Sequence, residues 1–327
     1  MRTDLTRLDF PEEAILFFEE LNGSLSSQED SFLASLQDKY MLCGAGDLTE
    51  EEIGSISADV QHQVEAWATD RGLSPYSGDM LFLIRCMPRL HEQYLRGGLD
   101  DERFYDICHD LTNKLRECKR RYGVYGTFVF HWFHRHFRME LFGLGRFQYE
   151  RRSFTREDIT FFTGPDGSLT TEPQEPGAVP VYTLHTGDTV YNFHIPSSGH
   201  LTDEQRLASY KMAYDFFGPS RNGIIPLICN SWLLWPDNRT LYPEGSNLQA
   251  FFDDFYPIAS YEPSPERIFS DAWRIYYVDY TGDPDLLPRE TSIQRSFAEY
   301  LREGGRVGSG LGVILFDGTH VLTSQNH

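Results

Sequence analysis

The chain has 327 residues, of which 40% are hydrophobic and 14% aromatic, so it can bury a core in one large or two ordinary domains and is not a disordered protein. Its net charge of −20 argues against nucleic acid or an anionic membrane surface as the main partner. No segment is long and apolar enough to span a bilayer, and the first residues lack the apolar core of a signal peptide.

The first third of the chain has the apolar spacing of helices. Proline–acidic or capping residues begin several of these segments, and glycines end them. The predicted helices cover residues 11–21, 31–42, 49–70, 79–95 and 100–122, with a kink expected at Pro88. The sequence therefore predicts a helical N-terminal domain over residues 1–123.

The pattern changes after residue 123. Residues 127–141 are dense in aromatic side chains and ambiguous, with a helix favoured by the length of the segment. Residues 146–152 alternate as a strand does. Two further strand-like runs, 179–184 and 190–195, flank a turn at 185–188 and suggest a hairpin.

Strands and helices alternate through the rest of the chain. Helices are predicted over 202–217, 246–256 and 292–302, and strands over 223–232, 268–279 and 310–316. This order predicts an α+β protein in which a mixed-sheet α/β domain, residues 124–327, follows the helical one.

Residues 189–207 are the most informative segment. A strand ends at Pro196, and a short loop leads into a helix whose first residues, Thr202 and Gln205, fit a capping box. The free N–H groups at such a helix start form a natural site for a phosphate or carboxylate. The alternative is an ordinary connection between a strand and a helix.

Two other segments could suggest a ligand. His131, His134 and His136 lie close together, but no H-E-x-x-H motif is present and we expect a half-buried aromatic segment with no metal. The glycines of residues 304–312 follow a helix and enter a strand, which is the wrong order for a phosphate-binding loop. We therefore expect no nucleotide there.

Several phrases in the second half resemble a bacterial family with a helical N-acyltransferase N-terminal domain and a GNAT-like C-terminal domain. They are Leu144-Gly-Arg-Phe-Gln-Tyr-Glu, Phe193-His-Ile-Pro-Ser-Ser-Gly-His-Leu-Thr, Cys229-Asn-Ser-Trp-Leu-Leu and Gly308-Ser-Gly-Leu-Gly-Val. The resemblance implies acyl transfer from acetyl-CoA or another acyl-CoA to an amine or similar small-molecule acceptor. It also implies that two parallel strands, 190–195 and 224–230, splay apart around the thioester.

The same resemblance assigns roles to residues. The coenzyme pyrophosphate would rest on the loop formed by Ser197, Ser198, Gly199, His200 and Leu201, although the family's usual spaced glycines are reduced to one. His194, Glu150 and Tyr256 are the candidates for base and acid, and Ser231 and Trp232 for contacts with acceptor or pantetheine. Each also has a structural alternative: a core or surface histidine, a glutamate paired with Arg151 or Arg152, a capping serine, and packed tyrosine and tryptophan rings.

Two other classes of function stay open from the sequence. One is a catalytically degenerate relative that binds a ligand or partner, and the other is a metal hydrolase built on the histidine run. The five scattered cysteines suit a reducing cytoplasm. The helical domain would either cover the cleft or form a homodimer, and the sequence does not distinguish the two.

Overall fold

The computed structural model describes residues 1–44, 48–197 and 199–324. Its internal contacts divide the chain into two compact units, Met1–Gly143 and Leu144–His327. We call them the helical unit and the sheet unit. Residues 124–143 belong to the helical unit.

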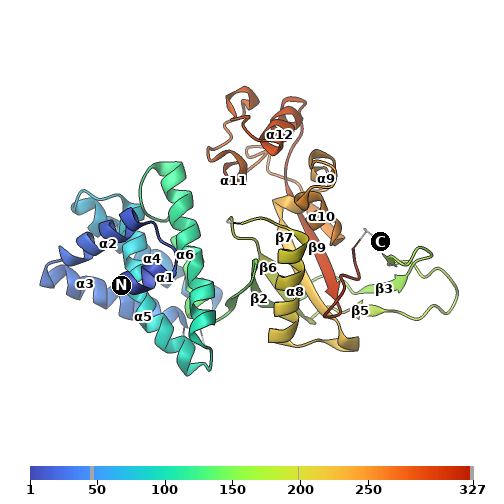
Figure 1. Ribbon diagram of the computed structural model, residues 1–327, viewed down its shortest axis with the longest axis horizontal. Coiled ribbons are helices and arrows are strands. Elements are labelled where there is room, and N and C mark those ends of the chain that lie inside the picture. The colour runs from blue at the N-terminus through green and yellow to red at the C-terminus, as the bar shows by residue number, and fades with distance from the viewer. Residues whose placement is uncertain (45–47, 198, 325–327) are drawn as a thin grey trace. The chain divides into compact units, whose positions relative to one another are not determined.

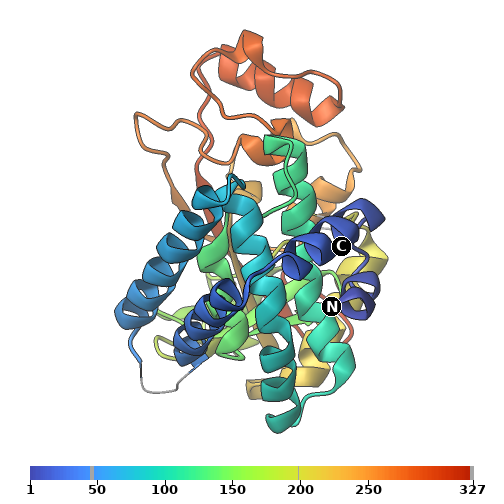
Figure 2. The ribbon, with the colours of Figure 1, turned by 90° about the vertical axis from the view of Figure 1, so that its left-hand side faces the viewer.

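The helical unit is built from helices that bury one apolar face each. They are α1 (Arg2–Arg7), α2 (Glu12–Gly23), α3 (Ser27–Met41), α4 (Glu50–Asp70), α5 (Pro75–Arg96), α6 (Asp101–Tyr122) and α7 (His134–Phe137), with short 3₁₀ turns η1 (Leu42–Gly44) and η2 (Phe130–Phe133). The long helices α4, α5 and α6 pack side by side (Figure 2). Thr49 and Glu52 cap α4 reciprocally, and α5 continues through Pro88.

Within the described residues, none of the helices combines the length and the apolar character needed to cross a bilayer. The long helices instead bury apolar stripes against each other, with Phe18, Tyr40, Phe82 and Phe104 among the fully enclosed rings. Residues 127–141 form only the short helices η2 and α7, so the longer helix expected there is wrong. Tyr40 packs against Phe130 and Phe137, which explains why this aromatic segment folds onto the core.

A six-stranded sheet with the order β1-β2-β6-β7-β9-β8 forms the centre of the second half (Figure 1). Its strands are β1 (Leu141–Leu144), β2 (Phe147–Ser153), β6 (Thr189–His194), β7 (Ile225–Ser231), β8 (Tyr256–Tyr261) and β9 (Ser309–Phe316). Strands β6 and β7 run parallel, whereas β2 with β6, β7 with β9, and β8 with β9 are antiparallel. This mixed sheet behind a helical region confirms the predicted fold class.

Helix α8 (Asp203–Phe217) covers one face of this sheet (Figure 1). Tyr210 on α8 contacts the rings of Phe147 on β2 and Phe193 on β6. The remaining helical segments of the sheet unit are η3 (Arg221–Gly223), η4 (Trp232–Leu234), α9 (Asn238–Leu241), α10 (Asn247–Asp253), α11 (Trp273–Tyr276), η5 (Pro284–Leu286) and α12 (Ser292–Arg302). Strand β6, helix α8 and strand β7 form a strand–helix–strand crossover. The loop that follows the carboxyl end of β6 therefore leads into α8.

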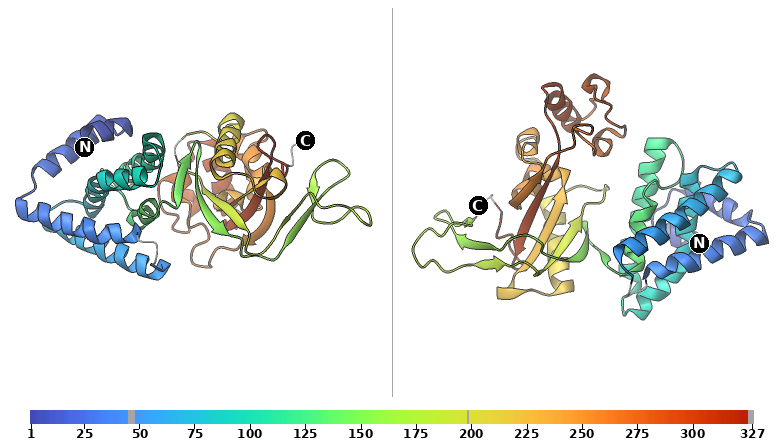
Figure 3. Two further views of the ribbon diagram at one scale, coloured as in Figure 1. Left: turned by 90° about the horizontal axis from the view of Figure 1, so that it is seen from below. Right: turned by 180° about the vertical axis from the view of Figure 1, so that it is seen from behind.

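A small three-stranded sheet extends beyond the main one (Figure 3). It has the order β4-β3-β5, from β3 (Ile159–Thr163), β4 (Leu169–Thr170) and β5 (Tyr182–Leu184). The hairpin expected between 179–184 and 190–195 is therefore wrong, because β5 pairs with β3 and β6 pairs with β2. Phe161, Tyr182 and Leu184 of the small sheet pack in one cluster with Val190 of β6.

Two predicted elements differ near the C-terminus. The helix expected over 246–256 ends at Asp253, and Tyr256 begins strand β8. Residues 268–279 form no strand, because Tyr277 takes a left-handed conformation (φ 58°) and Trp273–Tyr276 is a short helix. The carbonyl of Ile275 accepts a hydrogen bond from Gln294 of α12, so this segment is held by α12 and not by a strand neighbour.

The glycines of residues 308–312 allow a close approach of the backbone. A Cβ at Gly310 would lie 1.9 Å from the carbonyl oxygen of Leu234, and one at Gly312 would lie 2.8 Å from the ring of Phe255. Only glycine fits positions where another chain segment comes this near. These glycines therefore serve the packing of β9.

Candidate active site

The parallel strands β6 and β7 share only a short ladder of residue pairs among the described residues. They pair only at Tyr191 with Leu227 and at Asn192 with Ile228. Both strands continue beyond these pairs, β6 to His194 and β7 to Ser231, without further pairing between them in the described chain. The two expected strands are thus confirmed as parallel neighbours. We call their unpaired carboxyl ends the opening.

His194 and Glu150 meet beside this opening. Nε2 of His194 lies 2.9 Å from Oε1 of Glu150, which also accepts a hydrogen bond of 2.8 Å from the amide of Asn192. The other carboxylate oxygen of Glu150 accepts a 2.8 Å hydrogen bond from Arg152. Burial raises the pKa of Glu150, but the hydrogen bonds and charges of His194 and Arg152 outweigh it and lower the pKa to about 2. Glu150 is therefore a buried carboxylate at neutral pH.

This arrangement determines which ring nitrogen of His194 carries the proton. Nε2 also lies 3.1 Å from the amide nitrogen of Asn192, but this amide already donates to Glu150. A lone pair on Nε2 would face the negative oxygen of Glu150, so the favoured tautomer of the neutral ring donates from Nε2 to the carboxylate. In this tautomer the lone pair lies on Nδ1. The pair has the geometry of a base held in one orientation by a carboxylate.

Strand geometry places the pair on the face of the sheet that α8 does not cover. Glu150 lies directly opposite Asn192, and side chains alternate between faces along each strand. Phe147, Tyr149 and Phe193 point toward α8, so their even-numbered neighbours point away from it. His194 remains 29% exposed, which leaves its ring accessible to a substrate.

The loop after β6 has the features of an anion site. Gly199 has a φ of +80°, which favours glycine, and the N–H groups of Gly199, His200 and Leu201 donate no hydrogen bond to any described residue. Thr202 accepts a hydrogen bond from the N–H of Gln205 and so caps α8, as predicted. Ser197, Gly199 and His200 are exposed and Leu201 is buried. The predicted site residue Ser198 lies outside the described residues.

Arg146 holds this loop, and we missed it in the sequence. Its Nε donates to the carbonyl of His200 and its Nη2 to the carbonyl of Pro196, both at 2.9 Å. Burial lowers the pKa of Arg146 to about 10, so it remains charged at neutral pH. No carboxylate forms an ion pair with it among the residues that the structure describes. One arginine in the turn between β1 and β2 gives no periodic signal, but its place in the phrase Leu144-Gly-Arg-Phe could have drawn attention to it.

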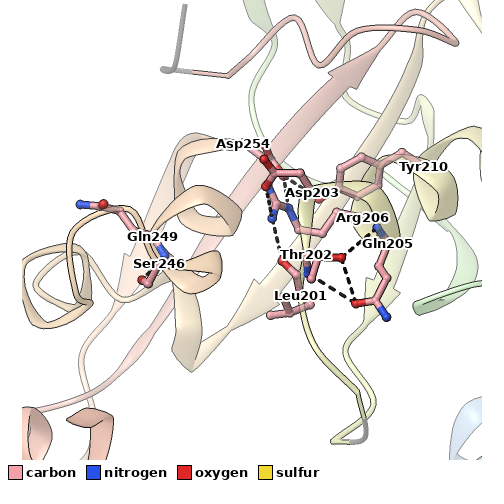
Figure 4. A network of polar contacts seen from close by, with 9 residues as sticks. All are labelled: Leu201, Thr202, Asp203, Gln205, Arg206, Tyr210, Ser246, Gln249 and Asp254. Atoms are coloured by element: carbon pink, nitrogen blue, oxygen red, sulfur yellow. Dashed lines mark hydrogen bonds and ion pairs between the residues drawn. The ribbon is translucent and has the colours of Figure 1, made fainter.

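A buried ionic network fixes the start of α8 (Figure 4). The guanidinium of Arg206 donates to Asp254 (2.9 Å) and to the carbonyl of Leu201 (2.7 Å), and it pairs with Asp203 (2.9 Å). Tyr210 donates to the same oxygen of Asp254. Because Arg206 contacts Leu201, the network links the phosphate-type loop to α10. The acidic Asp203 and Glu204 in the first turn of α8 oppose anion binding, but Arg206 offsets the first of them.

The structure does not bring Tyr256 to His194 and Glu150. Tyr256 lies on β8, and β9 and β7 separate β8 from β6. The spacing of neighbouring strands therefore places Tyr256 about 14 Å from β6. Its hydroxyl lies 3.0 Å from that of Thr171, the residue after strand β4 of the small sheet. Its ring packs edge-on against Phe161.

Ser231 and Trp232 lie at the carboxyl end of β7, the same end of the sheet as His194. Ser231 caps η4 by accepting a hydrogen bond from the N–H of Leu233. Trp232 packs against Phe269 and Phe297. Both side chains are only partly buried, so each has a structural task and still borders the opening.

No cysteine of the sheet unit offers an activated thiol. Cys229, on β7 beside the opening, is buried, and burial raises its pKa well above the ordinary value. It stays protonated and unreactive at neutral pH. Within the described residues there is also no group of three side chains that could hold a metal ion.

Comparison with known protein families accounts for both units. Residues 5–139 match the N-acyltransferase N-terminal domain, and residues 141–314 match the GNAT-like C-terminal domain. The chain belongs to this N-acyltransferase family with a GNAT-like C-terminal domain. The GNAT-like domain contains strands β6 and β7, the His194–Glu150 pair and the loop before α8.

Solved structures share this fold. An acyltransferase mutant in complex with octanoyl-CoA is 19% identical, with a TM-score of 0.64 over 94% of this chain and 85% of that one. An acyltransferase in complex with decanoyl-CoA and teicoplanin is also 19% identical, with a TM-score of 0.64 over 95% and 86%. A third, in complex with decanoyl-CoA, is 16% identical, with a TM-score of 0.64 over 94% and 85%. No curated protein sequence matches this member of the N-acyltransferase family.

Proposed function

We propose that this protein transfers an acyl group from acyl-CoA to an amine or similar nucleophile on a small-molecule acceptor. The observation that carries the proposal is the His194–Glu150 pair, at 2.9 Å, beside the opening between β6 and β7. Membership in the N-acyltransferase family and the fold shared with acyltransferases in complex with octanoyl-CoA and decanoyl-CoA support it.

In the proposed reaction, the thioester lies between the open strand ends. The acceptor nitrogen attacks the thioester carbon, and Nδ1 of His194 takes the proton that the nitrogen loses. The carbon–sulfur bond then breaks, and the proton passes from His194 to the leaving thiolate. The products are an amide and free CoA, and His194 returns to its starting state with Glu150 still ionised.

The coenzyme phosphates are proposed to bind the loop before α8. The free N–H groups of Gly199, His200 and Leu201 and the charge of Arg146 support this placement in a chain with a net charge of −20. Ser197 and Ser198 stay candidates for the same site. Ser231 and Trp232 are proposed to border the pantetheine or acceptor. Tyr256 has no role in this mechanism, since it lies on β8.

Acyl-chain length and location are finer proposals. Relatives in fold carry octanoyl-CoA and decanoyl-CoA, so we propose medium-chain acyl groups ahead of acetyl. All five cysteines are free and buried, which suits the reducing environment of a bacterial cytoplasm.

The test is a titration of acetyl-, octanoyl- and decanoyl-CoA by calorimetry, followed by measurement of thiol release with amine acceptors. The matched control for His194→Ala is His185→Ala, because His185 also pairs with a carboxylate, Asp158 at 2.6 Å, but outside the site. We expect thiol release to be lost in His194→Ala and kept in His185→Ala. Binding without turnover in the wild type would instead identify a catalytically degenerate, ligand-binding protein.

A further inference from the structure

Gln148 is a buried polar residue that the proposed mechanism has not used. It lies on β2 directly opposite His194 on β6, in the antiparallel pairing that also places Glu150 opposite Asn192. Directly opposed side chains share a face of the sheet, with Cβ atoms about 5 Å apart. Gln148 therefore borders the imidazole of His194 on the side away from α8.

The side-chain amide of Gln148 makes no hydrogen bond to a described residue, and although only 5% of the residue is exposed, its amide is not among the fully enclosed unpaired groups. A comparably buried glutamine of the sheet unit has both ends of its amide paired. Gln294, which is 4% exposed, donates to the carbonyl of Ile275 and accepts from Glu290 and Thr291. The amide of Gln148 is therefore available to hydrogen-bond a ligand that reaches this face of the sheet.

The chemistry of the site lacks one component that Gln148 can supply. When the acceptor attacks, negative charge develops on the thioester oxygen and needs a hydrogen-bond donor. Glu150 is an anion and His194 acts as the base, so neither provides that donor. A primary amide donates two hydrogen bonds and carries no charge that would disturb Glu150.

We propose that the amide nitrogen of Gln148 donates a hydrogen bond to the thioester carbonyl oxygen and stabilises the oxyanion during acyl transfer. This role rests on the proposed function. It assigns three neighbouring side chains of one sheet face to three tasks: Gln148 polarises the carbonyl, His194 moves the proton, and Glu150 orients His194. The carbonyl oxygen of the substrate would then occupy the hydrogen-bonding position that is unfilled beside Gln148.

The experiment compares Gln148→Met, which keeps the length of the side chain without a donor, with Gln148→Asn, which keeps the amide but withdraws it. Removing one oxyanion donor lowers kcat by about 10²–10³-fold, and we expect that loss for Gln148→Met with an unchanged Kd for acyl-CoA. Gln148→Asn should lie between Gln148→Met and the wild type. Thermal unfolding checks that each variant is folded.

The control is Tyr149→Phe, the next residue on β2, whose hydroxyl lies 3.0 Å from that of Ser209 on the α8 face. It should lose stability and keep kcat. Infrared spectra of bound acyl-CoA labelled with ¹³C at the carbonyl provide a second readout. The carbonyl stretch should shift to lower frequency in the wild type and return toward its solution value in Gln148→Met.

The outcomes separate this inference from the proposed function. Wild-type kcat in Gln148→Met, or an unshifted carbonyl band in the wild-type complex, would overturn the role of Gln148 and leave acyl transfer standing. If the wild type neither binds acyl-CoA nor releases thiol, the proposed function itself fails.

Discussion

Nε2 of His194 lies 2.9 Å from Oε1 of Glu150, although 44 positions separate the two residues in the chain. The antiparallel pairing of β2 with β6 brings them together, with one residue pair, Tyr149 and Phe193, between their own pairs on the ladder. A carboxylate in this position favours one tautomer of the histidine and fixes the orientation of its ring. Two consequences can be measured, one on catalysis and one on stability.

For catalysis, His194→Ala should lower kcat by about 10²–10⁴-fold, the usual contribution of a general base. Glu150→Gln should cause a smaller loss, because the base remains but its preferred tautomer is no longer enforced. The pH dependence of kcat/KM should also shift in Glu150→Gln. Equal activity of Glu150→Gln and the wild type at every pH would contradict an orienting role for the carboxylate.

For stability, the folded-state pKa of Glu150, about 2, lies below its ordinary value of 4.5. The unfolded chain therefore binds the proton first, so the stability that this carboxylate contributes is complete above pH 4.5 and is lost as the pH falls toward 2. Urea unfolding midpoints between pH 6 and 3 should fall less steeply in Glu150→Gln than in the wild type. Parallel curves would contradict the pairing.

Arg146 allows a test of the phosphate loop. Arg146→Gln removes a charge and the hydrogen bonds to the carbonyls of Pro196 and His200, so binding of acyl-CoA should weaken by about 1.5–3 kcal/mol, roughly 10–100-fold. Binding of the corresponding acyl-pantetheine, which lacks the nucleotide, should stay the same. Arg151→Gln, an exposed arginine on the following strand β2, is the control. An equal loss for both ligands would place the effect elsewhere.

For the buried pair of Arg206 and Asp254, we expect that removing one partner destabilises the protein more than replacing both. Asp254 is 6% exposed, and Asp254→Asn leaves the buried charge of Arg206 with only the exposed Asp203, which should cost about 3–5 kcal/mol. Replacing both partners, with Arg206→Met and Asp254→Leu, should cost less than that. Asp215→Asn removes an exposed pair with Lys211 on the same helix and should change stability by less than about 1 kcal/mol.

Gly310→Ala should destabilise the sheet unit by about 1–3 kcal/mol or prevent its folding, because the added carbon would meet the carbonyl oxygen of Leu234 at 1.9 Å. Gly54→Ala is the matched control within helix α4. An added carbon there has no neighbour within 4 Å, and alanine favours a helix over glycine by about 1 kcal/mol. The same substitution should therefore have opposite signs at the two positions, as measured by chemical denaturation.

Local chemistry made the helix starts predictable. Thr49 with Glu52 and Thr202 with Gln205 form the expected capping boxes, since both partners lie within four residues. The strand β6 and the helix after it followed from the same local pattern. The family phrases led to His194 and Glu150, and the structure places this pair in contact without testing its catalytic role.

Long-range contacts decided what the sequence could not show. The helix-like sequence pattern of residues 246–256 continues past Asp253. In the structure the helix ends at Asp253, and Tyr256 is the first residue of β8. Residues 268–279 are strand-like in sequence, yet α12 supplies the hydrogen bond to Ile275. Arg146 contacts the loop after β6, and Gln148 lies opposite His194 on β6. Both relationships join residues far apart in the chain, so the local sequence could not predict them.

The short ladder between β6 and β7 also has a mechanical consequence. Strands β1, β2 and β6 lie on one side of the gap and strands β7, β9 and β8 on the other, and only two residue pairs join the two sides directly. An amide-bearing molecule that enters the gap can hydrogen-bond to both open strand ends and so complete the sheet as a short additional strand would. The bound compound thereby becomes a structural component of the fold, and the enzyme should resist heat and proteolysis best while it is occupied.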